Sequence, residues 1–175
     1  MSELQAAIRI LPSLVVGVIL NFSMGLFVNK IPAVAIVIVS SLLAAISPLL
    51  MAVIDPSSIY WTNAFFAQLL QPISADCLIT VGLIVITEVF PKEKHSLAGA
   101  VFNTMTQFGT ALGLAIMQIV STLETKKYED SRPREEALMK GYRASFWTMF
   151  AFLLSCAVIG GFGLRKTGKV GLKKD

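Results

Sequence analysis

The sequence predicts an all-α membrane protein that crosses the bilayer about five times. Three observations lead to this fold class. Hydrophobic residues make up 55% of the 175-residue chain and charged residues only 15%, whereas soluble domains carry roughly 25% charged residues. The charges fall into a few clusters that leave long apolar stretches between them. Only helices or closed barrels satisfy the backbone in lipid, and these stretches lack the alternation of barrel strands.

Five stretches are long enough to form transmembrane helices, which need about 20 apolar residues each. Only a few residues join the first two, so these helices should be antiparallel neighbours. The third stretch is too long for a straight perpendicular span, and Pro72 in its middle should kink it. The expected spans run over residues 11–28, 32–54, 59–90, 96–122 and 145–164.

Residues 123–144 form the one sizeable polar segment between spans. A proline favours the first turn of a helix, an acid four residues before a lysine supports one, and a glycine often ends one. Pro133, Glu136, Lys140 and Gly141 follow this pattern. The sequence therefore predicts a short amphipathic helix from Pro133 to Gly141 within an extracytoplasmic loop.

Basic residues set the expected orientation, because they are enriched on the cytoplasmic side of membrane proteins. The tail at residues 165–175 is strongly basic and should be cytoplasmic. Counting back through five spans puts the N-terminus and residues 123–144 outside, with Lys30, Lys92 and Lys94 in cytoplasmic turns.

The fourth expected span carries a signal for close helix packing. Gly109 and Gly113 lie four residues apart, which is the spacing of small residues that lets another helix approach the backbone. We expect this pair to be a helix contact.

Asp76 is the only acidic residue well inside an expected span. A charge near the bilayer centre costs at least about 2.5 kcal/mol, so such residues are often functional. Asp76 shares a four-residue spacing with Gln68, Pro72 and Thr80, which predicts a stripe along a cavity or a helix contact. Two interpretations stay open: a proton-titrating or cation-attracting group in a transport path, or a structural carboxylate.

Three neutral amides are further candidates for contact with a transported solute. Asn103 and Gln107 lie on the fourth span with Thr106 and Thr110 at helical spacing, and Gln71 lies on the third. Each could equally bond to a neighbouring helix, an interaction worth only about 0.6 kcal/mol on average in membranes.

Several other classes of function are disfavoured. Cys77 and Cys156 both fall inside spans, and the single histidine, His95, has no cluster of ligand-type residues near it, so neither a metal site nor a cofactor is expected. No acid–base pair or nucleophile with its base is present, so an enzyme is not expected. The net charge of +4 comes from residues that flank spans, which does not point to nucleic acid.

Parts of the sequence resemble the closing spans of fungal major facilitator superfamily transporters. The likeness lies in Tyr60-Trp61, in the span through Ala75-Asp76, in LAGAVFNTMTQFGTALGLAI from Leu97 and in GYRASFW from Gly141. It is greatest for the drug:proton antiporter group that includes aminotriazole-resistance proteins and low-affinity ammonium transporters. The loop GLFVNKI departs from the family's glycine-and-basic motif, keeping little beyond Gly25 and Lys30.

This resemblance implies a partial C-terminal half of a transporter, because members of the superfamily have two six-helix halves with the substrate site between them. The expected function is proton-coupled transport of small solutes or drugs, with the chain inactive alone and completed by an N-terminal half. The alternative is a non-transporting, truncated paralogue that associates with a complete transporter. In either case the chain should contact membrane lipids, in the plasma or vacuolar membrane.

Overall fold

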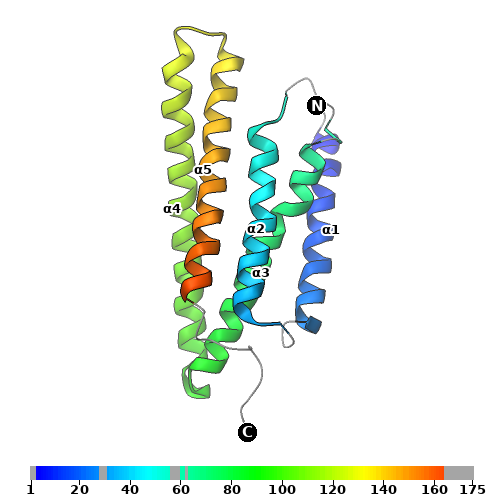
Figure 1. Cartoon of the computed structure of the whole chain (residues 1–175), viewed down its shortest axis with the longest axis vertical. Coiled ribbons are helices and arrows are strands. Elements are labelled where there is room, and N and C mark those ends of the chain that lie inside the picture. The colour runs from blue at the N-terminus through cyan, green and yellow to red at the C-terminus, as the bar shows by residue number, and fades with distance from the viewer. Residues whose placement is uncertain (1–2, 28–30, 56–59, 62, 164–175) are drawn as a thin grey trace.

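The computed structural model describes residues 3–27, 31–55, 60–61 and 63–163. Within these residues the chain forms five α-helices and one short 3-10 helix. They are α1 (Glu3–Phe27), α2 (Ala33–Ala52), α3 (Ala64–Val89), η2 (Lys92–Lys94), α4 (His95–Glu129) and α5 (Arg134–Gly163) (Figure 1). All five α-helices are long and apolar enough to cross a membrane, which confirms the predicted all-α, five-span fold class.

The helices form an elongated bundle in which α2 is central (Figure 1). One side of α2 packs against α3 and the other against α5, while α1 packs on α3 and α4 on α5. The α3 helix runs obliquely, from beside α1 at one end to the start of α4 at the other (Figure 1). The end of the bundle that holds the turn between α4 and α5 is called the hairpin end below.

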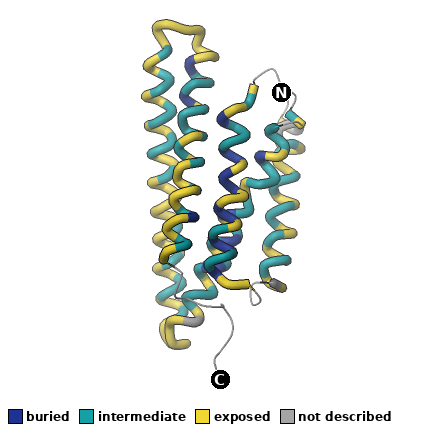
Figure 2. Tube along the Cα trace, viewed as in Figure 1, coloured by how far each residue is buried: buried dark blue, intermediate teal, exposed yellow. Residues whose placement is uncertain are grey.

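Small residues explain why α2 is the most buried helix (Figure 2). Its alanines and serines let neighbouring backbones come close, as in other membrane bundles. The central cluster joins one end of α2 to the middle of α3 through Ala33, Ile36, Val37, Cys77 and Val81. Most large apolar side chains of α1, α4 and α5 are exposed, as expected for surfaces that face lipid or further protein.

The third helix begins later than the sequence suggested, at Ala64 rather than at residue 59. The cause is a contact with α1. The Tyr60 hydroxyl donates a hydrogen bond to the Arg9 carbonyl oxygen at 2.6 Å, and the Arg9 guanidinium lies 4.9 Å from the Tyr60 ring centre. These contacts hold Tyr60 in a turn before the helix. The helix then continues through Pro72 to Val89.

The first helix begins earlier than residue 11, because the polar turn at Glu3 is already helical. Lys30 and the basic tail at residues 165–175 lie outside the described residues. The predicted orientation across the membrane, which depends on them, stays a prediction.

The expected loop at residues 123–144 is largely helical, which corrects the sequence analysis. The α4 helix continues to Glu129 and α5 begins at Arg134, directly after Pro133 as predicted. Gly141 does not end a short helix; it lies buried inside α5. At about 1.5 Å per residue, the 35 residues of α4 extend over about 52 Å, so α4 and α5 project beyond a core of roughly 30 Å.

Candidate functional site

Asp76 lies where α3 crosses α1. A Cβ atom added at Gly17 of α1 would lie 3.4 Å from Oδ2 of Asp76 and 3.9 Å from Cβ of Pro72. The carboxylate therefore lies about one methyl group away from the α1 backbone, although Asp76 is only partly buried. Thr80, predicted to share its stripe, donates its hydroxyl to the Asp76 carbonyl oxygen at 2.8 Å, so its hydroxyl serves the helix backbone.

Gln68 and Gln71 lie at a different place, in a cavity of about 170 Å³ between α2, α3 and α5. The cavity combines neutral polar groups with soft apolar ones: Ser47, Pro48, Met51, Ala64, Ala67, Gln68, Gln71, Phe146 and Met149 line it. It holds no charged side chain. Such a lining suits a small neutral or weakly polar solute, which amides can orient by hydrogen bonds.

The stripe from Gln68 to Asp76 thus does not line one common cavity. Residues four apart advance by about 400° on a helix, so each step drifts about 40° around the axis. Over two steps the drift carries the side chain from the α2–α5 side, where Gln68 lies, to the α1 side, where Asp76 lies. The structure therefore separates the candidate proton group from the candidate amide pocket.

Asn103 and Gln107 are exposed on α4. Two threonines of the same helix bond to its own backbone: the Thr106 hydroxyl donates to the Phe102 carbonyl oxygen and the Thr110 hydroxyl to the Thr106 carbonyl oxygen, each at 2.9 Å. Neither amide side chain has a hydrogen-bond partner among the described residues.

The predicted glycine pair shows the same openness. A Cβ atom at Gly109 or Gly113 would have no neighbour within 4 Å in the described part of the chain. The expected contact of another helix at this pair is therefore not made inside the chain. Packing against a segment outside it stays a prediction.

Other glycines make the close helix contacts, and sequence reasoning missed them. The Phe102 ring of α4 occupies the space beside Gly82 of α3, and Gly141 of α5 lies against Ser121 and Thr125 of α4. Gly160 and Gly161 meet Val37 and Ile38 of α2. A search for glycines four residues apart cannot find these contacts, because each of these glycines packs against a larger residue. The adjacent pair Gly160-Gly161 is the one sequence feature among them that could have indicated a close helix contact.

Buried serine hydroxyl groups occur on both α2 and α3. Ser40 donates to the Val37 carbonyl oxygen at 3.3 Å. The hydroxyls of Ser41 and Ser74 are buried without a partner among the described residues. These groups add polarity to the interior, but they carry no charge.

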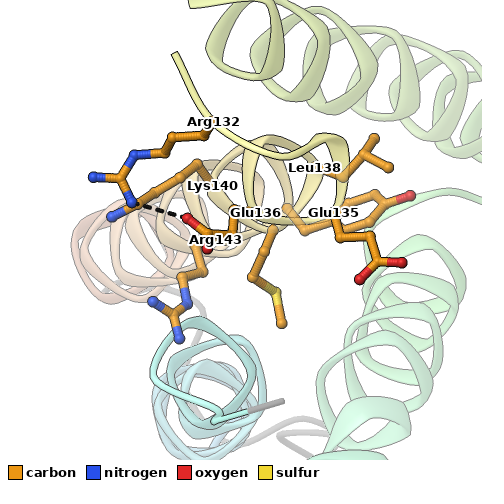
Figure 3. Close-up of a pocket in the computed structure, with 8 residues that line it drawn as sticks. Arg132, Glu135, Glu136, Leu138, Lys140 and Arg143 are labelled. Carbon is orange, nitrogen blue, oxygen red and sulfur yellow. Dashed lines mark hydrogen bonds and ion pairs between the residues drawn. The ribbon is translucent and has the colours of Figure 1, made fainter. Parts of the chain in front are cut away.

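A larger cavity, of about 670 Å³, lies at the hairpin end (Figure 3). Arg143 extends from it toward α2 and donates to the Ile54 carbonyl oxygen at 2.7 Å, which ties α5 to the end of α2. Glu136 forms an ion pair with Arg132 at 3.1 Å, whereas the sequence suggested Lys140 as its partner. The lining also includes Glu135, Leu138, Met139, Lys140 and Tyr142.

At the opposite end, an apolar groove of about 430 Å³ separates α3 from the start of α4. Phe90, Leu97 and Val101 line it, with Lys94 as its charged residue. His95 bonds through Nε2 to the Phe90 carbonyl oxygen at 2.7 Å. In the described residues, no group of three or more His, Cys, Asp or Glu side chains is arranged to hold a metal ion.

Comparisons with known proteins agree with this architecture. Residues 2–174 match the model of the Major Facilitator Superfamily. MFS-type transporter 1 of Pyricularia oryzae is 36% identical over 189 aligned positions, which cover 97% of this chain and 31% of that protein. Efflux pump terG of Aspergillus terreus is 28% identical, and the low affinity ammonium transporter of Saccharomyces cerevisiae is 21% identical; each alignment covers 83% of this chain and 27% of the relative.

The chain thus spans less than a third of the length of these relatives. Its match to the family confirms the resemblance seen in the sequence, and its five apolar helices make it an integral, multi-pass membrane protein. It belongs to the Major Facilitator Superfamily.

Proposed function

We propose that the chain acts as the C-terminal part of a proton-coupled transporter of small solutes or drugs, and that it transports nothing by itself. Relatives that bear the names efflux pump and ammonium transporter support a small-solute substrate. The name efflux pump also supports a plasma or vacuolar membrane location, since both membranes border the cytoplasm from which a solute would be exported.

The observation that carries this proposal is the open polar surface of α4. Asn103 and Gln107 are exposed on a helix of membrane-spanning length. Moving an amide into hydrocarbon without a partner costs roughly 2–7 kcal/mol. Two such groups on one face therefore favour protein or a water-filled cavity as their surroundings, rather than lipid. A transporter half supplied by a longer chain would provide both.

Asp76 supports proton coupling. It is the one acid well inside the spans, and it lies at a helix crossing without an ion-pair partner among the residues that the structure describes. A carboxyl group at such a place can take up a proton on one side of the membrane and release it on the other if the α1–α3 contact opens and closes. The amide-lined cavity at Gln68 and Gln71 would then bind the solute separately from the proton.

The test joins this chain to the N-terminal portion of the Pyricularia oryzae relative and reconstitutes the fusion in liposomes under a pH gradient. A pH-sensitive dye inside the liposomes reports proton flux when methylammonium or a panel of cationic drugs is added. The fusion should give solute-dependent flux, and the 175-residue chain alone should give none. Flux from the chain alone would contradict its inactivity, and a silent fusion that is correctly inserted would contradict the coupling.

A second candidate function is association with a complete transporter, as a non-transporting paralogue. The open Gly109 and Gly113 on α4 favour it, because they leave the backbone accessible to another helix. Co-purification with a full-length relative tests this idea. Gly109→Leu should abolish the association, while Ala100→Leu, at an exposed alanine of the same helix, should not.

A further inference from the structure

Gly17 is the residue of α1 that meets the candidate proton group. Its backbone faces Oδ2 of Asp76, with Pro72 one turn away on the same side of α3. Glycine leaves a gap of about one methyl group here, because a Cβ atom at 3.4 Å from the oxygen would be in ordinary van der Waals contact.

In the described part of the chain, Asp76 forms no ion pair. No ionisable side chain occurs on α1 from Leu11 to Phe27, anywhere on α2, or on α4 from Ser96 to Leu123. The titratable group beside Asp76 is Cys77, which is buried against Ile36 and Val37 of α2. Arg9, two turns before Gly17, holds its guanidinium over Tyr60.

The polar side chain of α1 nearest to the crossing, Asn21, bonds to its own helix backbone and not to Asp76. Asn21, one turn after Gly17, donates its amide to the Gly17 carbonyl oxygen at 3.0 Å. In the described residues, no hydrogen bond reaches the carboxyl oxygens of Asp76. The atom that occupies the position of the Gly17 hydrogens would therefore be the nearest contact that α1 makes with this carboxyl group.

We propose that Gly17 is a positioning residue for Asp76, which keeps the carboxyl group between α1 and α3 open to protonation. The biological use of this arrangement rests on the proposed function, but the arrangement itself does not, since the exposure of the carboxyl group can be measured without transport. It makes a directional prediction. An apolar methyl group at Gly17 should favour the neutral acid, whereas a hydroxyl group that can donate to the oxygen should favour the carboxylate.

The experiment uses the 175-residue chain in detergent micelles and a hydrophobic carbodiimide, which adds to a protonated carboxyl group in apolar surroundings. Labelling of Asp76 is followed by mass spectrometry over a series of pH values. Gly17→Ala should move the labelling profile to higher pH and Gly17→Ser to lower pH. At a fixed pH on the slope, each change should alter the labelling rate by about threefold.

Matched controls come from the same helix. Gly25 has open space around its Cβ position, so Gly25→Ala and Gly25→Ser should leave the profile unchanged. Asp76→Asn should remove the label and so identify its site. Circular dichroism in the same micelles checks that each variant is folded, and alanine and serine are small enough to keep the helix.

Opposite shifts for alanine and serine would support the positioning role, because a merely structural disturbance would move both variants in one direction. Equal shifts in one direction, or none, would overturn it. The two proposals can fail separately. If Asp76→Asn leaves transport by the fusion unchanged while the labelling shifts are opposite, the proton-coupled function falls and the role of Gly17 stands.

Discussion

Replacing Gly141 by alanine should loosen the contact between α4 and α5. The added Cβ would overlap the Thr125 hydroxyl and lie 2.5 Å from the Ser121 carbonyl oxygen. Non-bonded heavy atoms prefer about 3.5 Å, so the helices must separate by about 1 Å at this point. The Ser121 oxygen belongs to the backbone and cannot turn away.

The expected cost follows from two contributions. Forcing one methyl group into a packed contact costs about 1–3 kcal/mol. The Ser145 hydroxyl donates to the Met117 carbonyl oxygen at 3.0 Å one turn further along both helices, and separation would weaken this bond, worth about 0.6 kcal/mol in membranes. Against this, alanine gains up to about 1 kcal/mol over glycine in helix propensity. We expect a net loss of about 0.5–2.5 kcal/mol.

Reversible unfolding of the chain in mixed micelles, followed by circular dichroism as denaturing detergent is added, gives the change in stability. Gly109→Ala is the control, because its Cβ would meet nothing within 4 Å of the described chain. The double change Gly141→Ala with Thr125→Ala should recover part of the loss. If Gly141→Ala proves as stable as Gly109→Ala, the close contact between α4 and α5 does not exist as described.

The remaining predictions concern other parts of the bundle. Arg143→Ala should lower the free energy of unfolding by about 1.5–3 kcal/mol, since it removes a charged donor from a carbonyl oxygen at the end of α2; Arg132→Ala, at an exposed ion pair, should cost at most about 1 kcal/mol in the same unfolding assay. Asp76→Asn in the fusion should insert normally yet lose transport driven by a pH gradient, and unchanged flux would count against proton coupling. A cysteine introduced at Ser131, in the turn between α4 and α5, should react with an impermeant maleimide only from outside the cell. Reaction from the cytoplasmic side alone would reverse the topology.

Local signals were enough to predict the fold class. Long apolar stretches specify spans because lipid admits only helices or closed barrels, and Pro133 specifies the start of a helix because its missing donor costs nothing there. The ends of the helices depended instead on contacts between them. Tyr60 leaves α3 because it binds the α1 backbone, and Gly141 stays within α5 because α4 packs on it. Neither neighbour is visible from spacing along one helix.

Asp76 could be singled out because the cost of a buried acid depends on one residue and its depth. Its partner could not, because Gly17 becomes relevant only when α1 is known to cross α3 at that level. Gln68 was assigned to the same surface as Asp76, yet the drift of a four-residue spacing around a helix takes it to another cavity. Sequence patterns therefore identify polar residues that are energetically unfavourable in a membrane more reliably than they show which of these residues lie together in one site.

Gly109 and Gly113 show what such a pattern means when its partner lies elsewhere. Their spacing indicates that a backbone can be approached, but not by which helix. In the described chain both positions are open, while Asn103 and Gln107 of the same helix also lack partners. Small residues and unpaired amides together disfavour a lipid-facing surface. Lipid offers an amide no hydrogen bond, and small residues are typical of surfaces that pack against another helix. The open surface of α4 therefore favours contact with protein that a longer transporter would supply, in keeping with the short share of its relatives that this chain covers.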